Sequence, residues 1–293
     1  MDERNLAGLF EEHRTRLRAV AYRMLGSVSE ADDAVQETWI RLGRTGADEV
    51  NDLGAWLTTV VARVCLNALR SRERRREDPL DVRVPDPIVA PGTGGDPEHE
   101  ALLADSVGLA LMVVLETLSP DERVAFVLHD MFAVPYEEIA PLIDRSTPTA
   151  RQLASRARRR VQGHAPVPDP DLARQREVVD AFFAAARDGD LDALVTVLHP
   201  DVVLRSDGGV ARPRQTTVIT GARNVAAQAV TFGRLSPYAR PALVNGTAGT
   251  VVTAHGRPLS VMAFTVTEGR ITAIDVLADP DRLDALVPAP SGD

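Results

Sequence analysis

The most constraining feature of this chain is a predicted pair of short helices at residues 136–161, YEEIAPLIDRSTPTARQLASRARRRV, with a turn at Asp144-Arg145-Ser146. The first helix has apolar residues at Ile139, Ala140 and Ile143. We expect Thr147 to cap the second helix and Pro148 to occupy its first position, where a missing N–H costs nothing. Apolar residues then recur at helical spacing, which predicts one buried face. They are Ala150, Leu153, Ala154, Ala157 and Val161.

The remaining positions of this second helix are polar or basic. Six arginines and no acidic residue lie between Arg145 and Arg160. Side chains of these types read base edges and phosphates when a helix enters the major groove. The candidate DNA-contacting residues are Thr149, Arg151, Gln152, Ser155, Arg156 and Arg159. The alternative is an ordinary solvated helix that carries arginines.

Charge is distributed unevenly along the chain. The formal net charge is -9, yet residues 63–76 contain six arginines and one glutamate. Local basic segments can meet phosphate, while acidic surface elsewhere repels it or faces a basic protein partner. All 33 basic residues are arginine, and because lysine codons are AT-rich we expect the source to be a high-GC bacterium.

The composition also limits the class of protein. A single cysteine, Cys65, lies in an apolar helical segment, so we expect no disulfide framework and no cysteine metal site. No signal peptide opens the chain, and no apolar stretch is long enough to cross a membrane. We therefore expect a soluble, cytoplasmic protein that does not contact a membrane.

Helical periodicity and linker composition predict three domains. Residues 1–77 and 100–162 are predicted to be helical, and five prolines and three glycines fall between positions 78 and 98. We assign 78–99 and 163–170 as linkers. Residues 171–289 begin with helices at 172–187 and 190–198, and continue with β-strand segments that end in a hairpin turn at 267–270. Helices followed by a strand meander predict an α+β domain with a curved antiparallel sheet.

Three segments, taken in order, resemble bacterial RNA polymerase sigma factors of the extracytoplasmic-function class. They are ADDAVQETWIRL at 31–42, WLTTVVARVCLNALRSRERR at 56–75, and the segment from LSPDERV at 118 to 161. The resemblance implies two all-α domains, sigma region 2 and a region 4 that contains the helix-turn-helix. It also implies a transcription initiation factor that binds core RNA polymerase, through its β′ and β subunits, and promoter DNA.

The same resemblance assigns roles to individual residues. Core-polymerase contact falls on Asp33, Gln36 and Glu37, and recognition of the −35 element falls on the second helix of region 4. Recognition of the −10 element is implied for Arg63, Asn67, Arg70 and Arg72. An exposed amide flanked by arginines suits an unpaired base held near backbone phosphate.

Residues 171–289 resemble a SnoaL-like domain, a cone-shaped α+β barrel that some sigma factors carry. Two motifs of that subgroup are present in altered form. Asp-Gly-Gly-Gly-Lys is matched only by Asp207, Gly208 and Gly209, and Asn-Pro-Asp-Lys-Leu corresponds to residues 279–283. The second set is Asp279, Pro280, Asp281, Arg282 and Leu283. We expect both segments to be regulatory loops that contact the sigma domains.

Three functions of this C-terminal domain remain open: regulation in cis, sensing of a small molecule, and catalysis. Catalysis would need an acid–base pair in a cavity, and no motif joins the ionisable candidates. These are His199, Asp201, Asp207, His255 and Asp275. We expect regulation in cis, with no enzymatic activity, no catalytic residues, no cofactor and no metal. For the whole chain, the alternative is a helix-turn-helix repressor or activator that binds duplex DNA alone.

Overall fold

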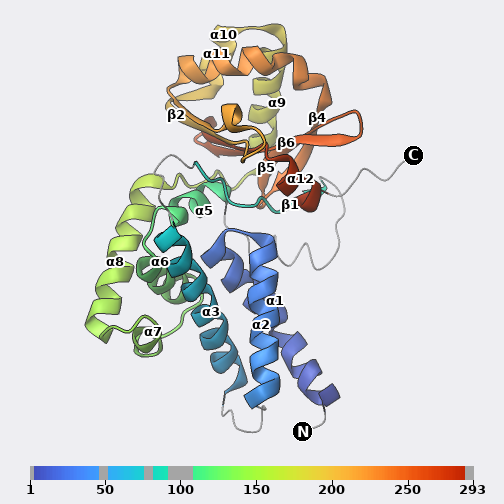
Figure 1. Cartoon of the computed structure of the whole chain (residues 1–293). Helices are drawn as coiled ribbons and strands as arrows, with labels where there is room; N and C mark the ends of the chain where they lie inside the picture. The colour runs from blue at the N-terminus through green and yellow to red at the C-terminus, as the bar shows by residue number, and fades with distance from the viewer. Residues whose placement is uncertain (1–2, 46–51, 76–81, 92–107, 288–293) are drawn as a thin grey trace. The chain divides into compact units, whose positions relative to one another are not determined.

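The computed structural model describes residues 3–45, 52–75, 82–91 and 108–287, which form two compact units (Figure 1). The first unit comprises residues 1–79 and 114–164, and the second comprises 80–113 and 165–293. Segment 80–113 thus groups with the C-terminal unit, whereas the sequence predicts a linker and the start of region 4 there. The predicted domain limits at 77, 99 and 289 lie outside the described residues.

Three long helices make up the N-terminal part of the first unit: α1 (Glu3–Leu25), α2 (Val28–Thr45) and α3 (Leu53–Arg75). Helix α1 is followed by Gly26, whose φ of +65° suits a residue without Cβ. On α3, Trp56, Val60 and Val64 are only half-buried. The buried residues of the three helices include Leu17, Met24, Val35, Leu42, Leu57, Val61, Cys65 and Leu66.

Shorter helices complete the first unit. They are α6 (Pro120–Phe126), a π-helical turn η2 (Val127–Met131), α7 (Tyr136–Leu142) and α8 (Thr147–His164). Helix α5 (Leu109–Glu116) precedes them and includes residues of both units, because the division falls at residue 113. A capping box formed by Ser119 and Glu122 starts α6.

The predicted helix-turn-helix is confirmed. Asp144 occupies the turn with φ +55°, a left-handed conformation that Asp tolerates. The predicted cap is wrong by one residue, because Ser146 Oγ accepts the Thr149 N–H at 3.4 Å. Four of the five predicted apolar positions are buried, and Val161 is half-buried.

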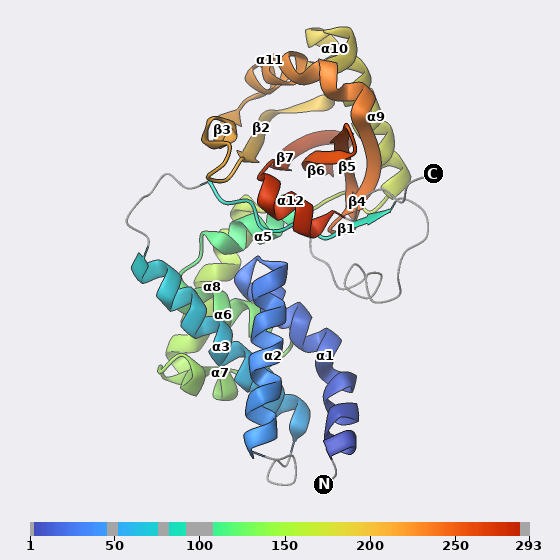
Figure 2. The same cartoon turned by 45° about the vertical axis from the view of Figure 1, so that its right-hand side comes forward.

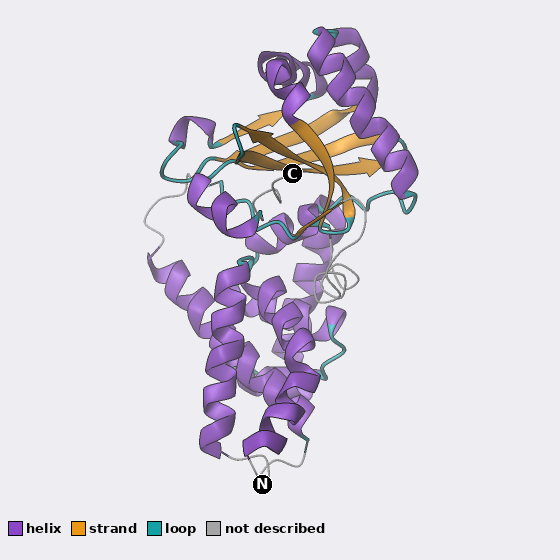
Figure 3. Ribbon diagram, turned by 90° about the vertical axis from the view of Figure 1, so that its right-hand side faces the viewer, coloured by secondary structure: helices purple, strands orange, loops and turns teal. Residues whose placement is uncertain are grey.

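The second unit is an α+β domain, as predicted. Helix α9 (Leu172–Asp188) is capped by Asp171 and ends at Gly189, and Asp190 caps α10 (Leu191–Val197). Two further helices, α11 (Ala222–Phe232) and α12 (Pro280–Leu286), were not predicted. Figures 2 and 3 show α9, α10 and α11 on one face of the curved sheet.

The sheet has seven strands in the order β1-β4-β5-β6-β7-β2-β3. Strands β2 (Leu198–Asp207) and β3 (Thr217–Thr220) follow the first helices, and β4 (Ala239–Val244), β5 (Thr247–Ala254), β6 (Arg257–Thr267) and β7 (Arg270–Leu277) form a meander. The predicted turn between β6 and β7 is confirmed, with positive φ at Glu268 and Gly269. The prediction of a wholly antiparallel sheet is wrong, because β2 and β7 pair in parallel. A long crossover separates them in sequence, as parallel pairing requires.

The core of this domain lies between the sheet and its helices. Phe182 and Phe264 meet edge to face at 5.5 Å between ring centroids. Burial of this apolar surface is the main force that holds helices and sheet together. Other members of the core are Val179, Leu194, Leu198, Val202, Leu204, Val225, Val266, Ile271 and Ile274.

The seventh strand comes from a distant part of the chain. Strand β1 (Val89–Pro91) pairs antiparallel with β4, with Val89 opposite Val244. Next to this ladder, Asn245 N–H donates to the Ile88 carbonyl and Ile88 N–H donates to Asn245 Oδ1, each at 2.9 Å. Part of the predicted linker is therefore an edge strand of the C-terminal sheet, and Pro91 suits an edge because it lacks an N–H.

Candidate nucleic-acid interface and linker-binding site

Helix α2 presents the residues predicted to contact core polymerase. Asp33 and Gln36 are exposed, and Glu37 is half-buried and pairs with Arg41 at 2.9 Å one turn away. The opposite face of α2 is buried through Ala34, Val35 and Leu42. The helix therefore has a polar face outside the core, which carries the carboxylates of Asp33 and Glu37.

Helix α3 carries the residues predicted to contact the −10 element, and the structure divides them into two pairs. Arg63 and Asn67 are exposed one turn apart. Arg72 instead donates to the Leu25 carbonyl at 2.9 Å and pairs with Glu30. Arg70 also has protein partners, so in this state only the first pair is free to meet DNA.

Arg70 joins α3, in the predicted region 2, to the helices of the predicted region 4 within the first unit. Its guanidinium lies 3.0 Å from the Asp121 carboxylate and 3.6 Å from that of Asp144, and it donates to the Ile143 carbonyl at 3.3 Å. A second contact between the two predicted regions is the hydrogen bond that Arg16 donates to the Phe132 carbonyl at 3.3 Å. The structure therefore holds the helices of the two regions packed together.

Helix α8 presents its predicted DNA-contacting residues away from its buried stripe. Arg151, Gln152 and Arg159 are exposed, and Thr149 and Ser155 are half-buried. Two arginines already have partners in this structure. Arg156 pairs with Glu122 at 3.2 Å, and Arg151 lies 5.3 Å over the ring of Tyr136.

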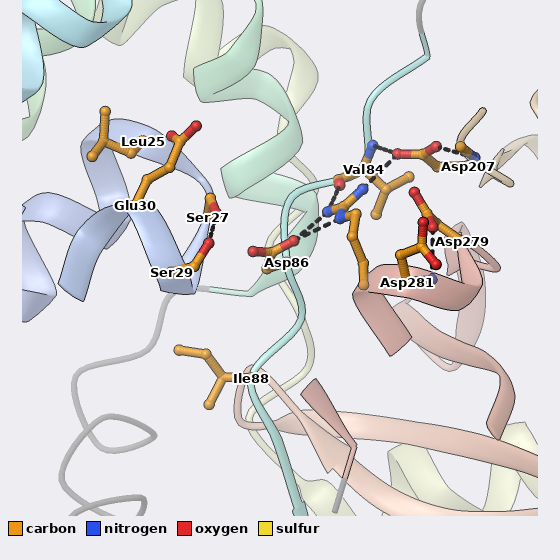
Figure 4. A network of polar contacts seen from close by, with 12 residues as sticks. Leu25, Ser27, Ser29, Glu30, Val84, Asp86, Ile88, Asp207, Asp279 and Asp281 are labelled. Atoms are coloured by element: carbon orange, nitrogen blue, oxygen red, sulfur yellow. Dashed lines mark hydrogen bonds and ion pairs between the residues drawn. The ribbon is translucent and has the colours of Figure 1, made fainter. Parts of the chain in front are cut away.

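A dense set of polar contacts in the second unit surrounds Arg282, and Figure 4 shows its partners Val84, Asp86 and Asp207. Its Nε donates to Asp86 Oδ1 at 2.8 Å, its Nη1 to Asp207 Oδ2 at 2.8 Å, and its Nη2 to the Val84 carbonyl at 2.6 Å. The Val84 N–H donates to the same Asp207 oxygen at 3.0 Å. We call these four residues, Val84, Asp86, Asp207 and Arg282, the linker clamp.

The clamp is supported by close backbone packing of the two predicted loops. A Cβ on Gly209 would lie 2.0 Å from Asp279 Oδ2, and one on Gly208 would lie 2.1 Å from the Arg212 carbonyl oxygen. Asp279 caps α12 by accepting the Asp281 N–H at 3.0 Å, which positions Arg282 on the first turn. The glycines thus let the loops approach closely enough for Asp207 and Arg282 to meet.

Some residues of the two predicted loops belong to the linker clamp, and the others position it. Asp207 and Arg282 are in the clamp, whereas the side chain of Asp281 is exposed and its N–H donates to Asp279 Oδ1. Leu283 is buried and anchors α12. Pro280 occupies the first turn of α12, where its missing N–H is tolerated.

The sequence did not identify Val84 or Asp86 as functional. A signal exists in the segment Val84-Pro85-Asp86-Pro87, because prolines restrict both their own φ and the residue before them to extended conformations. Such a segment is pre-organised to lie along a sheet. The distance of 196 residues between Asp86 and Arg282 hid the pairing.

The ionisable residues considered for catalysis are dispersed. His199 accepts the Asp201 N–H, and His255 is exposed in a turn. Asp275 is buried and pairs with Arg205 at 3.1 Å, and burial raises the pKa of Asp275 although Arg205 opposes the shift. None of the five candidates lines the cavity of about 470 Å³ in this domain.

Local structure also shifts the pKa values of Asp169 and Cys65. The backbone N–H groups of Gly269 and Glu268 lower the pKa of Asp169, which accepts both at 2.9 Å. Burial raises the pKa of the Cys65 thiol, which keeps it neutral and unreactive. Within the described ranges, no group of three His, Cys, Asp or Glu residues is arranged to hold a metal, and no helix is long and apolar enough to span a membrane.

Comparison with known proteins defines the class. Residues 9–75 match sigma-70 region 2, and residues 108–161 match sigma-70 region 4. The chain is 40% identical over 289 residues to the ECF RNA polymerase sigma factor SigJ of Mycobacterium tuberculosis, covering 93% of this chain and 91% of that protein. It is 35% identical over 287 residues to the probable ECF RNA polymerase sigma factor SigI of the same species, covering 96% of each.

A solved structure agrees with these relatives. The crystal structure of Mycobacterium tuberculosis SigJ matches with a TM-score of 0.79 at 37% identity, covering 96% of this chain and 99% of that one. The two sigma regions define a transcription initiation factor, which binds core RNA polymerase and promoter DNA and is not an enzyme. The chain belongs to the ECF RNA polymerase sigma factors. This membership removes the alternative of a simple helix-turn-helix repressor.

Proposed function

We propose that the C-terminal domain of this sigma factor regulates it in cis, by holding the segment that connects region 2 to region 4. The observation that supports this is the linker clamp. In it, Asp207 and Arg282 bind Val84 and Asp86 of this segment through charge-assisted hydrogen bonds, which are stronger than neutral ones. The adjoining strand β1 adds backbone pairing to β4.

The consequence of holding this segment follows from the distance that regions 2 and 4 must span. Elements named −10 and −35 lie about 25 base pairs apart, or roughly 85 Å of duplex at 3.4 Å per step. Helix α8 has 18 residues and is only about 27 Å long. Arg70 of α3 lies 3.6 Å from Asp144, in the turn that precedes α8. The proposed −10 and −35 contacts therefore lie much closer together than 85 Å, and regions 2 and 4 must separate before both elements are bound.

In this proposal, the docked linker favours the state in which regions 2 and 4 are packed together. Release of the linker favours an extended state in which the two regions are apart. Because the clamp and the sigma regions belong to one chain, tethering supplies a high effective concentration and the contacts need not be individually strong. Core polymerase, engaged by Asp33, Gln36 and Glu37 through its β′ and β subunits, would draw the equilibrium toward the extended state. The protein would act where core polymerase is, in the cytoplasm.

The DNA contacts form the second part of the proposal. Arg63 and Asn67 would hold an unpaired base of the −10 element, with Arg70 and Arg72 joining once their present partners are released. On α8, Gln152 and Ser155 are proposed to meet base edges. The surrounding positions Thr149, Arg151, Arg156 and Arg159 would provide further base and phosphate contacts of the −35 element.

Run-off transcription with purified core polymerase tests the regulatory proposal. Arg282→Ala should raise the transcript yield of the full-length protein, because it opens the clamp without touching either sigma region. Arg257→Ala is the matched control, since Arg257 is an exposed arginine of the same domain outside the clamp. An Arg282→Ala protein that folds and transcribes like the Arg257→Ala control would contradict regulation through the linker.

A further inference from the structure

The C-terminal domain contains a cavity of about 470 Å³ between its sheet and the helices that cover it. Its walls are largely apolar and include Phe182, Phe183, Met262 and Val276. Met262 and Val276 lie next to the buried core yet are only half-buried, since one side of each faces the cavity. Cavities of this volume that are lined in this way bind small molecules.

The charged side chains at the rim of the cavity, Arg212 and Arg214, are both cationic. Arg212, Arg214 and Gln215 come from the loop after β2, and Gln228 comes from α11. The side chain of Arg214 is exposed, and the lining residues include no aspartate, glutamate or histidine. A guanidinium beside an apolar cavity favours an anion that accepts its hydrogen bonds.

The loop that forms this rim is the same loop that forms the clamp. Gly208 N–H donates to Thr216 Oγ1 at 3.1 Å, and Arg212 N–H donates to the Gly208 carbonyl at 3.0 Å. Arg212 also donates to the Ala278 carbonyl at 3.1 Å, and Ala278 N–H donates to the Asp207 carbonyl at 2.7 Å. Asp207 is the residue that binds both Arg282 and Val84. A molecule that orders this loop therefore also orders the clamp.

We infer that the cavity binds a small monocarboxylate with an apolar body, and that its occupation strengthens the docking of the linker. The apolar body fills the space against Phe182 and Met262, and the carboxylate accepts hydrogen bonds from Arg214 and the free nitrogens of Arg212. The coupling to transcription rests on the proposed function, whereas the binding itself does not.

Calorimetric titration of the full-length protein with decanoate, 1-decanol and decylamine tests the binding. Decanoate should bind about tenfold or more tightly than 1-decanol, the ratio expected for one charge-assisted hydrogen bond, and decylamine should bind more weakly than either. Arg214→Gln should remove most of the preference for decanoate. Absence of decanoate binding, or equal affinity for decanoate and 1-decanol, would overturn the assignment.

A pair of substitutions on α11 locates the site. Ala229 lines the cavity and Ala227 is exposed on the same helix, so Ala229→Phe should abolish decanoate binding while Ala227→Phe should not. Circular dichroism verifies that both variants fold. Unchanged binding by a folded Ala229→Phe protein would place decanoate elsewhere and overturn the proposal, and Arg214→Gln provides the test if Ala229→Phe does not fold.

Hydrogen exchange of the Val84 and Ile88 amides tests the coupling. Saturating decanoate should slow their exchange about fivefold or more, the lower end of ordinary coupling between two sites. Decanoate binding without slower exchange would overturn the coupling. If decanoate does not bind but Arg282→Ala still raises transcription, this inference fails and the proposed function stands. If decanoate binds and Arg282→Ala leaves transcription unchanged, the proposed function fails instead.

Discussion

Truncation of the clamp arginine should release the linker from the C-terminal sheet. Arg282→Ala leaves the Asp86 and Asp207 carboxylates, 8% and 9% exposed, without their cation. Breaking a buried ion pair costs about 3–5 kcal/mol. Because the Arg282 side chain is itself 23% exposed, solvent screening reduces the cost to about 2–3 kcal/mol. At about 1.4 kcal/mol per factor of ten, the docking equilibrium should fall roughly 30- to 150-fold.

A double-mutant cycle measures this coupling directly. Arg282→Ala, Asp86→Ala and the double variant are compared through the exchange rates of the Val84 and Ile88 amides. The two single substitutions should interact by about 1 kcal/mol or more, because the residues share the hydrogen bond at 2.8 Å. Additive effects, or unchanged protection of Val84 in Arg282→Ala, would show that the clamp does not hold the linker. Arg257→Ala again serves as the control.

Three further outcomes follow from the geometry. Gly209→Ala should destabilise the C-terminal domain by about 2 kcal/mol or more, because position 209 combines a positive φ of +60° with a steric clash. Gly256→Ala should cost less, because position 256 has φ +73° but open space around it. Thermal unfolding of the two variants compares their stabilities. Charge reversal at Asp33 and Glu37 together should weaken binding to core polymerase with the helix content unchanged, and equal polymerase affinity in a pull-down titration would refute the role of that face. Gln152→Ala should relax preference at one −35 base pair by about 1–3 kcal/mol in promoter-binding competition, and a uniform loss across all base pairs would assign this side chain to phosphate instead.

Local sequence patterns predicted the helix-turn-helix well. The buried stripe from Ala150 to Ala157 and the turn at Asp144 both depend on neighbouring residues, so spacing and turn chemistry were sufficient. The same holds for the turn at Glu268-Gly269. Where the determinant is local, the fold could be predicted from the sequence alone.

Features that depend on distant partners were not predictable in this way. The parallel pairing of β2 with β7 is set by the path of the whole meander, and the charge pair of Asp86 with Arg282 is set by the final sheet. The sequence pattern places Arg70 on the same polar face of α3 as Arg63 and does not distinguish the two side chains. Only the packing of region 4 against α3 gives Arg70 the partners Asp121 and Asp144. The proposed roles of these residues in binding polymerase and DNA remain predictions.

The contribution of β1 to the sheet has a consequence for aggregation and for the evolution of the chain. Without residues 89–91, β4 would become an open edge whose unpaired N–H and C=O groups could template association with another chain. A fragment that contains only residues 165–293 should therefore be prone to self-association, although its apolar core would be intact. The segment between the sigma regions is under two constraints at once, since any change in its length or sequence alters both the reach of the sigma regions and the solubility of the domain that follows them.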